Sequence, residues 1–375
     1  MSLARMCRIA VIAASVSLPL GLSASAAHAK PTVDVAFVLD TTGSMAGLIE
    51  GAKRKIWAIA TSILDQNPEA EIRIGLVAYR DIGDDYVTRK FDLTTDIQDL
   101  YANLLQVKAQ GGGDWPESVN EALDVAINKL QWSKGDDSRR IVFLVGDAPP
   151  HMDYAQDTKY EITLKVAQQK NIIVNAVLTG GARDTERVWR DVAQRGDGRF
   201  MAIPQDGGQV VIIETPYDEE IIILQNEINK TVIPYGPRAL QKRTEDKARQ
   251  LSEVARAAPA SASDMASYIN KRAKVSSEAV TGGGDLVSDV ASGGRTLEGI
   301  KIDELPEALR TMSMQDRTAE LDKQMALRKQ LNTKLAVLVA KRDAYVAAQR
   351  DKTTTPKVSS FDREVEATLK LQLKK

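Results

Sequence analysis

The stretch Val33–Met45, which reads VDVAFVLDTTGSM, decides the fold of this chain. Its apolar, β-branched first half predicts a buried strand, and the Thr, Gly and Ser residues after Asp40 predict a tight loop that leads into a helix. Asp40, Thr42 and Ser44 alternate along this loop, so in an extended backbone their side-chain oxygens project to the same side. A carboxylate and two hydroxyls are hard oxygen donors, which suit a small hard cation such as Mg²⁺. The stretch therefore predicts a strand that ends in a metal-binding loop.

Strand and helix patterns alternate between residues 30 and 237. Apolar runs rich in β-branched residues predict strands at Val33–Leu39, Glu71–Tyr79, Val87–Leu93, Arg140–Val145, Ile172–Leu178 and Arg199–Ile203. Amphipathic stretches predict helices at Ala46–Leu64, Ile97–Val107, Glu117–Leu130, Tyr160–Gln169, Asp184–Gln194 and Tyr217–Val232. This alternation is typical of an α/β fold with a doubly wound, mostly parallel sheet flanked by helices.

Two further loops bring acidic residues to one edge of the predicted sheet. In a doubly wound sheet, ligands bind beyond the carboxyl ends of the strands, where the strand order reverses. Asp147 follows the fourth predicted strand, so it meets Asp40 if these two strands are neighbours. Asp114 follows a Gly-Gly-Gly run at 111–113, which lets the backbone pass close to another loop. Asp114 also has a structural alternative, in which it caps the next helix and Glu117 completes a capping box.

The three loops resemble, in sequence and in order, the metal-ion-dependent adhesion site of von Willebrand factor type A domains. The first loop of that site reads Asp-x-Ser/Thr-x-Ser. The resemblance implies the doubly wound fold and one bound ion, Mg²⁺ or else Mn²⁺ or Ca²⁺. The ligands that it implies are Asp40, Thr42 and Ser44 from the first loop, Asp114 from the second and Asp147 from the third.

The second loop departs from the common pattern of that family. Many members have Thr where this chain has Asp114, and the runs GGGDWPE and DAPPH are more similar to the subgroup found near α-kinases. An additional carboxylate would raise the affinity for a cation. It would also reduce the residual positive charge that an acidic ligand experiences.

Three more residues are expected at the rim of the site, where a partner would bind. Asp81 follows a strand predicted to run parallel to the first, although a solvated turn is its simpler interpretation. His151 follows two prolines close to Asp147 and either orders that loop or contributes to the rim. Trp115 is either an exposed anchor for a partner or a residue packed beneath its own loop.

The motifs favour a binding protein over an enzyme. The sequence has no Gly-x-x-x-x-Gly-Lys-Ser/Thr loop, no Gly-x-Ser-x-Gly elbow and no Cys/His cluster, and no catalytic partner for His151 can be placed. We expect a Mg²⁺-dependent module whose ion engages an acidic group of a protein partner. The alternatives are a metal-assisted hydrolase, in which the ion polarises a phosphoryl or carbonyl oxygen, and an envelope scaffold, in which the ion is structural.

Residues 1–29 have the pattern of a signal peptide. Arg5 and Arg8 precede an apolar run, and Ala27-His28-Ala29 is an A-x-A cleavage site. We therefore expect an exported protein, periplasmic or secreted, that begins at Lys30 and needs no membrane anchor. The single cysteine, Cys7, lies in this leader, so the fold would contain no disulfide.

Residues 238–375 predict an α-helical region that follows a domain at 30–237. Helices are expected at Arg238–Ala257, Asp264–Lys274, Ser313–Arg350 and Phe361–Leu373, with a joint at Ala258–Ser263. The long helix has an apolar face formed by Leu321, Leu331, Leu335, Leu338 and Tyr345. Gln324, Arg328 and Arg342 interrupt this face, which favours packing in a small bundle or against the first domain over a strict coiled coil.

Charge differs between the two regions. Acidic side chains outnumber basic ones over residues 30–237, and the reverse holds over 238–375. The acidic excess is consistent with cation binding. The basic excess is explained by a solvated helical face or by an anionic partner, and we expect self-association through these helices rather than binding to nucleic acid.

Overall fold

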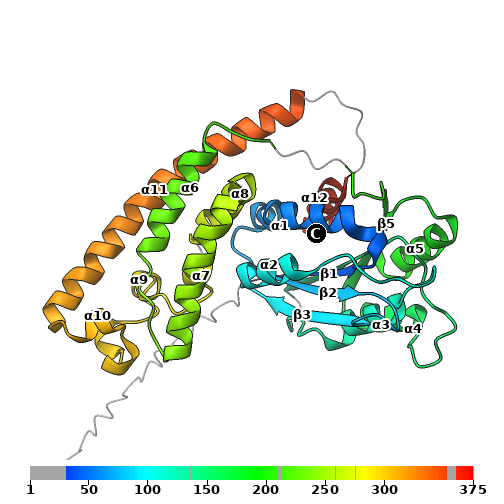
Figure 1. The fold of residues 1–375 in the computed structure, drawn as a ribbon, viewed down its shortest axis with the longest axis horizontal. Coiled ribbons are helices and arrows are strands. Elements are labelled where there is room, and N and C mark those ends of the chain that lie inside the picture. Colours follow the sequence, from blue (N-terminus) through cyan, green and yellow to red (C-terminus); the bar gives the residue numbers. More distant parts are fainter. Residues whose placement is uncertain are drawn as a thin grey trace, which may run out of the picture. The chain divides into compact units, whose positions relative to one another are not determined.

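The structure is a computed structural model that describes residues 31–135, 137–208, 213–257, 259–274, 276–352 and 360–374. The expected signal peptide, with its cleavage site and Cys7, lies outside these residues. A six-stranded sheet in the order β3-β2-β1-β4-β5-β6 forms the first part of the fold (Figure 1). Its strands are β1 (Thr32–Asp40), β2 (Glu71–Tyr79), β3 (Thr88–Thr94), β4 (Ser138–Gly146), β5 (Ile172–Thr179) and β6 (Asp197–Ile203). Only β3, at one edge, is antiparallel to its neighbour, so the predicted mostly parallel sheet is confirmed.

The strand order places a switch point between β1 and β4. The chain passes from β1 outward to β2 and β3, then crosses back to β4 on the other side of β1. Leu39 of β1 pairs with Val145 of β4, so both strands end at the same level of the sheet. Asp40 and Asp147 therefore emerge at the same crevice, as the sequence predicts.

Helices cover both faces of the sheet, because successive residues of the buried strands point to opposite sides. The helices that follow the strands are α1 (Ala46–Gln66), α2 (Ile97–Gln106), α3 (Val119–Asp124), α4 (Tyr160–Gln169), α5 (Arg183–Arg195) and α6 (Asp218–Lys230). Val33 and Val35 of β1 pack into one apolar cluster with α1 and α2, whereas Ala36 and Val38 pack into a second cluster with α3, α4 and α5.

One predicted helix differs in its form. The sequence predicts a single helix over Glu117–Leu130, but α3 begins at Val119 and is continued by a π-helix over Val125–Lys129. The N-cap of α3 is Ser118. Glu117 therefore lies before the helix and cannot complete the capping box that the sequence suggests.

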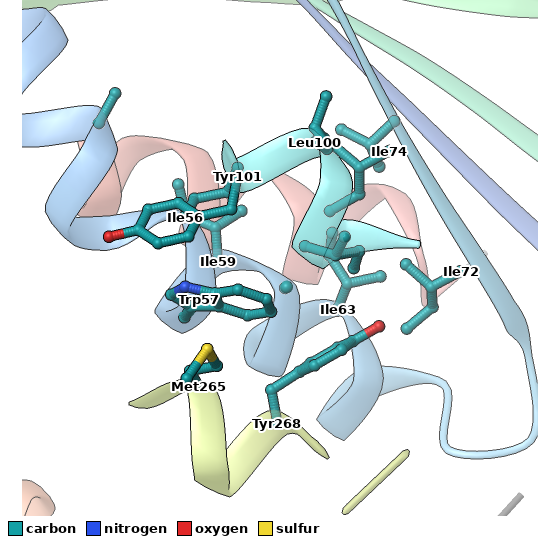
Figure 2. Close-up of a cluster of buried hydrophobic side chains, with 14 of the residues drawn as sticks. Ile56, Trp57, Ile59, Ile63, Ile72, Ile74, Leu100, Tyr101, Met265 and Tyr268 are labelled. Atoms are coloured by element: carbon teal, nitrogen blue, oxygen red, sulfur yellow. The ribbon is translucent and has the colours of Figure 1, made fainter. Parts of the chain in front are cut away.

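The remaining helices divide between the first apolar cluster and a third one, which the two shortest of them form with the start of the longest. They are α7 (Arg238–Ala257), α8 (Pro259–Arg272), α9 (Leu286–Ala291), α10 (Glu307–Arg310), α11 (Met314–Lys352) and α12 (Phe361–Gln372). Figure 2 shows Trp57 of α1 close to Tyr101 of α2 and Tyr268 of α8, with ring centroids 5.5 Å and 5.7 Å apart. The expected joint over Ala258–Ser263 is wrong for its described part, because α8 already begins at Pro259, and proline is well tolerated in the first turn of a helix.

The C-terminal helix α12 returns to the sheet. The Phe361 ring lies 6.1 Å from the Phe37 ring of β1. Val365 and Leu369 of the same helix are fully buried. The backbone N–H of Phe361 donates to the carbonyl of Gly207, in the loop after β6. Helix α12 therefore completes the apolar layer over α1 and β1. The division into domains at residue 237 stays a prediction.

Buried arginines fix the long helix α11. Leu321, Leu331, Leu335 and Leu338 are buried, in agreement with the predicted apolar face. Arg328 is paired with Asp285, the N-cap residue of α9. Arg342 is paired with Asp218 of α6 and Asp264 of α8, both at 2.8 Å. The charges that interrupt the apolar face thus point to acidic partners on other helices, and α11 packs against α6 and α8.

Within the described ranges, no helix has both the length and the apolar character needed to cross a bilayer.

The Arg342 pairs predict a large stability effect. Arg342→Ala should lower the free energy of unfolding by about 3 to 5 kcal/mol, because it leaves the buried carboxylate of Asp218 and the half-buried carboxylate of Asp264 without their cation. Urea denaturation followed by circular dichroism measures this change. Lys230→Ala is the matched control: its pair with Glu227 is exposed, so the expected change is below about 1 kcal/mol. Equal effects of the two substitutions would contradict this role of Arg342.

Candidate metal centre

The loops that carry the three motifs are joined by backbone hydrogen bonds at the carboxyl edge of the sheet. The first loop contacts the glycine-rich loop, because Gly43 N donates to Gly111 O and Gln110 N donates to Thr41 O. The glycine-rich loop contacts the third loop through Glu117 N, which donates to Pro149 O at 2.9 Å. The motifs, which are spread in sequence between residues 40 and 151, therefore meet at one place.

Asp40 organises the first loop. Its Oδ1 atom accepts hydrogen bonds from the backbone N–H of Thr42 at 2.8 Å and from the Thr42 hydroxyl at 2.7 Å. The Thr42 hydroxyl lies 3.3 Å from the Ser44 hydroxyl. The three side chains thus gather as the alternation predicts. Asp40 and Thr42 are buried, whereas Ser44 is exposed, so the group has one side towards solvent.

A second carboxyl group lies beside Asp40. Burial, together with the nearby charge of Asp147, raises the pKa of Asp40 to about 7. Asp147 is itself buried, and its Oδ2 atom accepts a hydrogen bond from Gln205 at 2.5 Å. The other oxygen of Asp40, Oδ2, is buried and has no hydrogen-bond partner among the described residues.

Glu117 adds a third carboxyl group, which the sequence analysis did not select. Burial, followed by the charges of Asp40, Asp81, Asp84 and Asp147, raises its pKa to about 9. A Cβ atom placed on Gly112 would lie 3.2 Å from Glu117 Oε1 and 3.2 Å from Thr42 Cβ, so the carboxyl group approaches the first loop across this glycine. Its Oε2 atom is buried without a hydrogen-bond partner in the described part of the chain.

This donor set fits a divalent cation. The carboxyl groups of Asp40, Glu117 and Asp147 and the hydroxyls of Thr42 and Ser44 provide oxygen atoms, which are the ligands that Mg²⁺ and Ca²⁺ prefer. Carboxylates that share a buried site repel each other unless a proton or a cation lies between them. The raised pKa values and the unpaired Asp40 Oδ2 and Glu117 Oε2 atoms are what such a site shows before the ion is added.

Asp114, the ligand expected from the second loop, makes its ion pair elsewhere. Its side chain is 62% exposed, and its Oδ2 atom lies 3.5 Å from His151 Nε2. Asp81 Oδ2 lies at the same distance from this nitrogen. Asp81, Asp114 and His151 therefore form a second cluster. Asp114 lies four residues before the N-cap of α3, so the structure does not support its helix-capping alternative either.

The expected rim residues differ in exposure. Trp115 is 48% exposed, and its Nε1–H donates to Asp184 at the start of α5 at 2.7 Å. Its role in binding a partner stays a prediction. Asp81 and His151 are buried, so the solvated turn expected at Asp81 is wrong, and the position of His151 fits the alternative in which it orders its loop. The loop after β2 folds inward because Asp81 accepts hydrogen bonds from Ser118 and Tyr154, both at 2.8 Å.

His151 is held on several sides. Its ring stacks on Tyr154, with centroids 3.9 Å apart and planes at 8°. Its Nδ1 atom lies 2.8 Å from Asp153 Oδ1. Burial alone would lower the pKa of His151, but the hydrogen bond to Asp153 and the charges of Asp81 and Asp114 raise it overall.

Comparison with known proteins identifies a family for the part of the chain that contains the sheet. Residues 34–215 match a family model described as a von Willebrand factor A domain. A putative ariadne-like RING finger protein of Acanthamoeba polyphaga mimivirus is 33% identical over 123 residues, which are 32% of this chain and 11% of that protein. The alpha-protein kinase vwkA of Dictyostelium discoideum is 29% identical over 133 residues, which are 35% of this chain and 20% of the kinase. The chain thus spans a fifth or less of the length of these two relatives.

Two solved structures are also similar. The VWA domain of SpRpn10 is 14% identical with a TM-score of 0.36, and the match covers 47% of this chain and 89% of that domain. Proximal thread matrix protein 1 from the mussel byssus is 15% identical with a TM-score of 0.35, and the match covers 47% of this chain and 43% of that protein. By the match of the family model, residues 34–215 of this chain form a von Willebrand factor A domain.

Proposed function

We propose that this von Willebrand factor A domain is a protein-interaction module that depends on a divalent cation, with Mg²⁺ as the first choice and Mn²⁺ or Ca²⁺ as alternatives. Asp40, Thr42, Ser44 and Asp147 would hold the ion, and Glu117 would take the place that the resemblance gives to Asp114. The observation that carries the proposal is the buried pair of carboxyl groups of Asp40 and Asp147, with Asp40 Oδ2 unpaired among the described residues.

The partner would present an acidic group to the ion, and the charge balance of the site leaves room for it. The high pKa of Glu117, about 9, means that this carboxyl group gives up its proton less readily than Asp40 does. Coordination by the carboxylates of Asp40 and Asp147 would formally neutralise a divalent cation, and a protonated Glu117 would add no further negative charge. A cation balanced in this way still attracts a further oxygen ligand at its solvent side. Ser44 and Trp115 are exposed, and they would form part of the surface that a partner contacts.

The similarity to the two relatives does not support an enzyme activity for this chain. Their names describe a kinase and a RING finger protein, but the matched segments cover only 20% and 11% of those proteins. We propose binding without catalysis. We also propose export to the periplasm or the medium, on the sequence of residues 1–29 alone, and N-terminal sequencing of the mature protein would test it.

Removal of one carboxyl group should abolish cation binding. Asp40→Asn should reduce Mg²⁺ affinity by at least about 100-fold, because it removes a charge and a ligand oxygen at once. Isothermal titration calorimetry with Mg²⁺ and Mn²⁺ measures the loss, and circular dichroism checks the fold. Asp85→Asn removes the same charge from an exposed side chain of the loop after β2 and should leave the affinity unchanged. Unaltered Mg²⁺ binding by Asp40→Asn would defeat this assignment.

The stability of the metal-free protein should depend on pH through Asp40. Its pKa is about 7 in the folded protein and 3.8 in a model peptide, so the folded state retains a proton that the unfolded chain loses. The stabilisation is fully present below about pH 4 and is lost as the pH rises to about 7, with a change on the order of 4 kcal/mol.

Urea unfolding in chelator, repeated across this pH range, measures the effect. The difference between the wild type and Asp40→Asn isolates the contribution of this group, because the amide does not titrate. Excess Mg²⁺ should restore stability at about pH 7, since the cation replaces the proton. If the difference between the two proteins does not vary with pH, Asp40 has an ordinary pKa.

Partner binding should require the ion. With the immobilised full chain as bait, a protein in an envelope extract should be retained in Mg²⁺ and released by chelator. The Asp40→Asn bait should not retain it in either buffer, whereas Asp85→Asn should behave as the wild type does. Retention that is equal with and without the ion would favour the alternative in which the metal is only structural.

A further inference from the structure

The cluster of Asp81, Asp114 and His151 has the composition and spacing of a metal site. One ligand atom from each residue can be chosen so that all three lie within 4.8 Å of one another. His151 Nε2 lies 3.5 Å from Asp81 Oδ2 and 3.5 Å from Asp114 Oδ2. Ligands at about 2.1 Å from a tetrahedral ion are about 3.4 Å apart, so these separations match an ion placed between the three atoms.

The imidazole nitrogen that faces this cluster has no hydrogen bond. His151 is 5% exposed, and Nε2 is buried without a hydrogen-bond partner among the residues described. Burying a polar nitrogen unpaired is costly, and the loop between β4 and α4 nevertheless holds it at two carboxylates. The unpaired Nε2 atom of His151 points to a ligand independently of the acidic residues nearby.

The surrounding side chains orient the cluster as an outer shell does around a bound metal. His151 Nδ1 lies 2.8 Å from Asp153 Oδ1, so an Nδ1–H can donate to this carboxylate and leave the lone pair of Nε2 directed at the cluster. Asp81 Oδ1 accepts from Ser118 and Asp81 Oδ2 accepts from Tyr154. Stacking on Tyr154 fixes the plane of the imidazole. Metal-binding histidines commonly donate their second ring N–H to a carboxylate in this way.

We propose that Asp81, Asp114 and His151 bind a divalent transition-metal ion, of which Zn²⁺ is the best representative. One imidazole nitrogen and two carboxylates form a three-ligand set, which leaves a fourth position for water or for a group of a partner. The exposed side chain of Asp114 gives the ion access from solvent. The site is separate from the one at Asp40 and Asp147 and does not depend on it.

Because one of its ligands is a nitrogen, this site should prefer different metal ions from the site at Asp40 and Asp147. Imidazole suits Zn²⁺ and other first-row transition metals, whereas Mg²⁺ prefers carboxylate, hydroxyl and water oxygens. The chain would therefore place an oxygen-only site and a mixed nitrogen–oxygen site on neighbouring loops. Asp114, three residues before Glu117, would serve the second of these sites and Glu117 the first.

The test uses the full chain with Asp40→Asn, so that the oxygen-only site does not contribute. Zn²⁺ affinity is measured by competition with a chromophoric chelator, and Co²⁺ serves as an optical probe of ligand number and geometry. We expect one Zn²⁺ per chain and a visible Co²⁺ spectrum of low coordination number. Adding His151→Gln or Asp114→Asn should weaken Zn²⁺ binding by more than about 100-fold. Adding Asp153→Asn should weaken it by about 10- to 100-fold, because Asp153 positions the imidazole.

Two controls accompany these variants. Asp114 is mostly exposed, so Asp114→Asn should retain the fold even if His151→Gln does not. Asp85 lies on the same loop as Asp81 with its side chain 80% exposed, and Asp85→Asn should change Zn²⁺ affinity by less than about 2-fold. In the chain with Asp40 intact, Asp114→Asn should leave Mg²⁺ affinity unchanged.

The outcomes separate this proposal from the proposed function. If the Asp40→Asn chain binds no Zn²⁺, or binds it as tightly after Asp114→Asn and His151→Gln, the cluster is an ion pair of a protonated histidine and the proposal is overturned. If Asp40→Asn fails to reduce Mg²⁺ binding in a chain that still binds Zn²⁺ at the cluster, the proposed function fails and the second site stands.

Discussion

The rest of the candidate metal centre depends on the burial of two carboxyl groups, Asp40 and Asp147, side by side. Their proximity follows from the parallel register of β1 and β4, which ends both strands at the same level on either side of the switch point. In such a buried place the two groups cannot both be ionised without a counter-charge. Hydrogen bonds between the surrounding loops hold this arrangement in place. The sheet and these loops together position the negative charge that a cation would neutralise.

Buried ion pairs hold the helices that follow the sheet. Arg328 and Arg342 of α11 are buried, and their acidic partners lie on α6, α8 and at the start of α9. Because an unpaired buried charge is costly, a shift of α11 along its axis would separate these pairs and be penalised. Apolar packing of Leu331 and Leu335 favours contact between the helices but does not by itself define one position along the axis. The ion pairs therefore give α11 its register.

The sequence was sufficient for most of the sheet and its helices, because strand and helix periodicities are local. It failed where the direction of a side chain depends on distant residues. Asp114 and Glu117 are three residues apart in a loop without periodicity, and the bridge between Glu117 and Pro150 decides which of them approaches Asp40. The pairing of Asp114 with His151 depends on the same bridge. The acids that pair with Arg328 and Arg342 are also far away in sequence, so their burial could not be predicted. Pro259 was assigned to a joint from composition, although proline suits the first turn of a helix.

The position of α12 has a consequence for the order in which the chain becomes compact. Phe361 packs against Phe37, and the residues between them make up nearly the whole described chain. Because α12 is synthesised after the elements that it covers, the apolar surface of α1 and β1 stays open while the residues before α12 are being made. During synthesis, a sheet that is otherwise formed would still expose this apolar surface. A chaperone that holds unfinished chains would bind there.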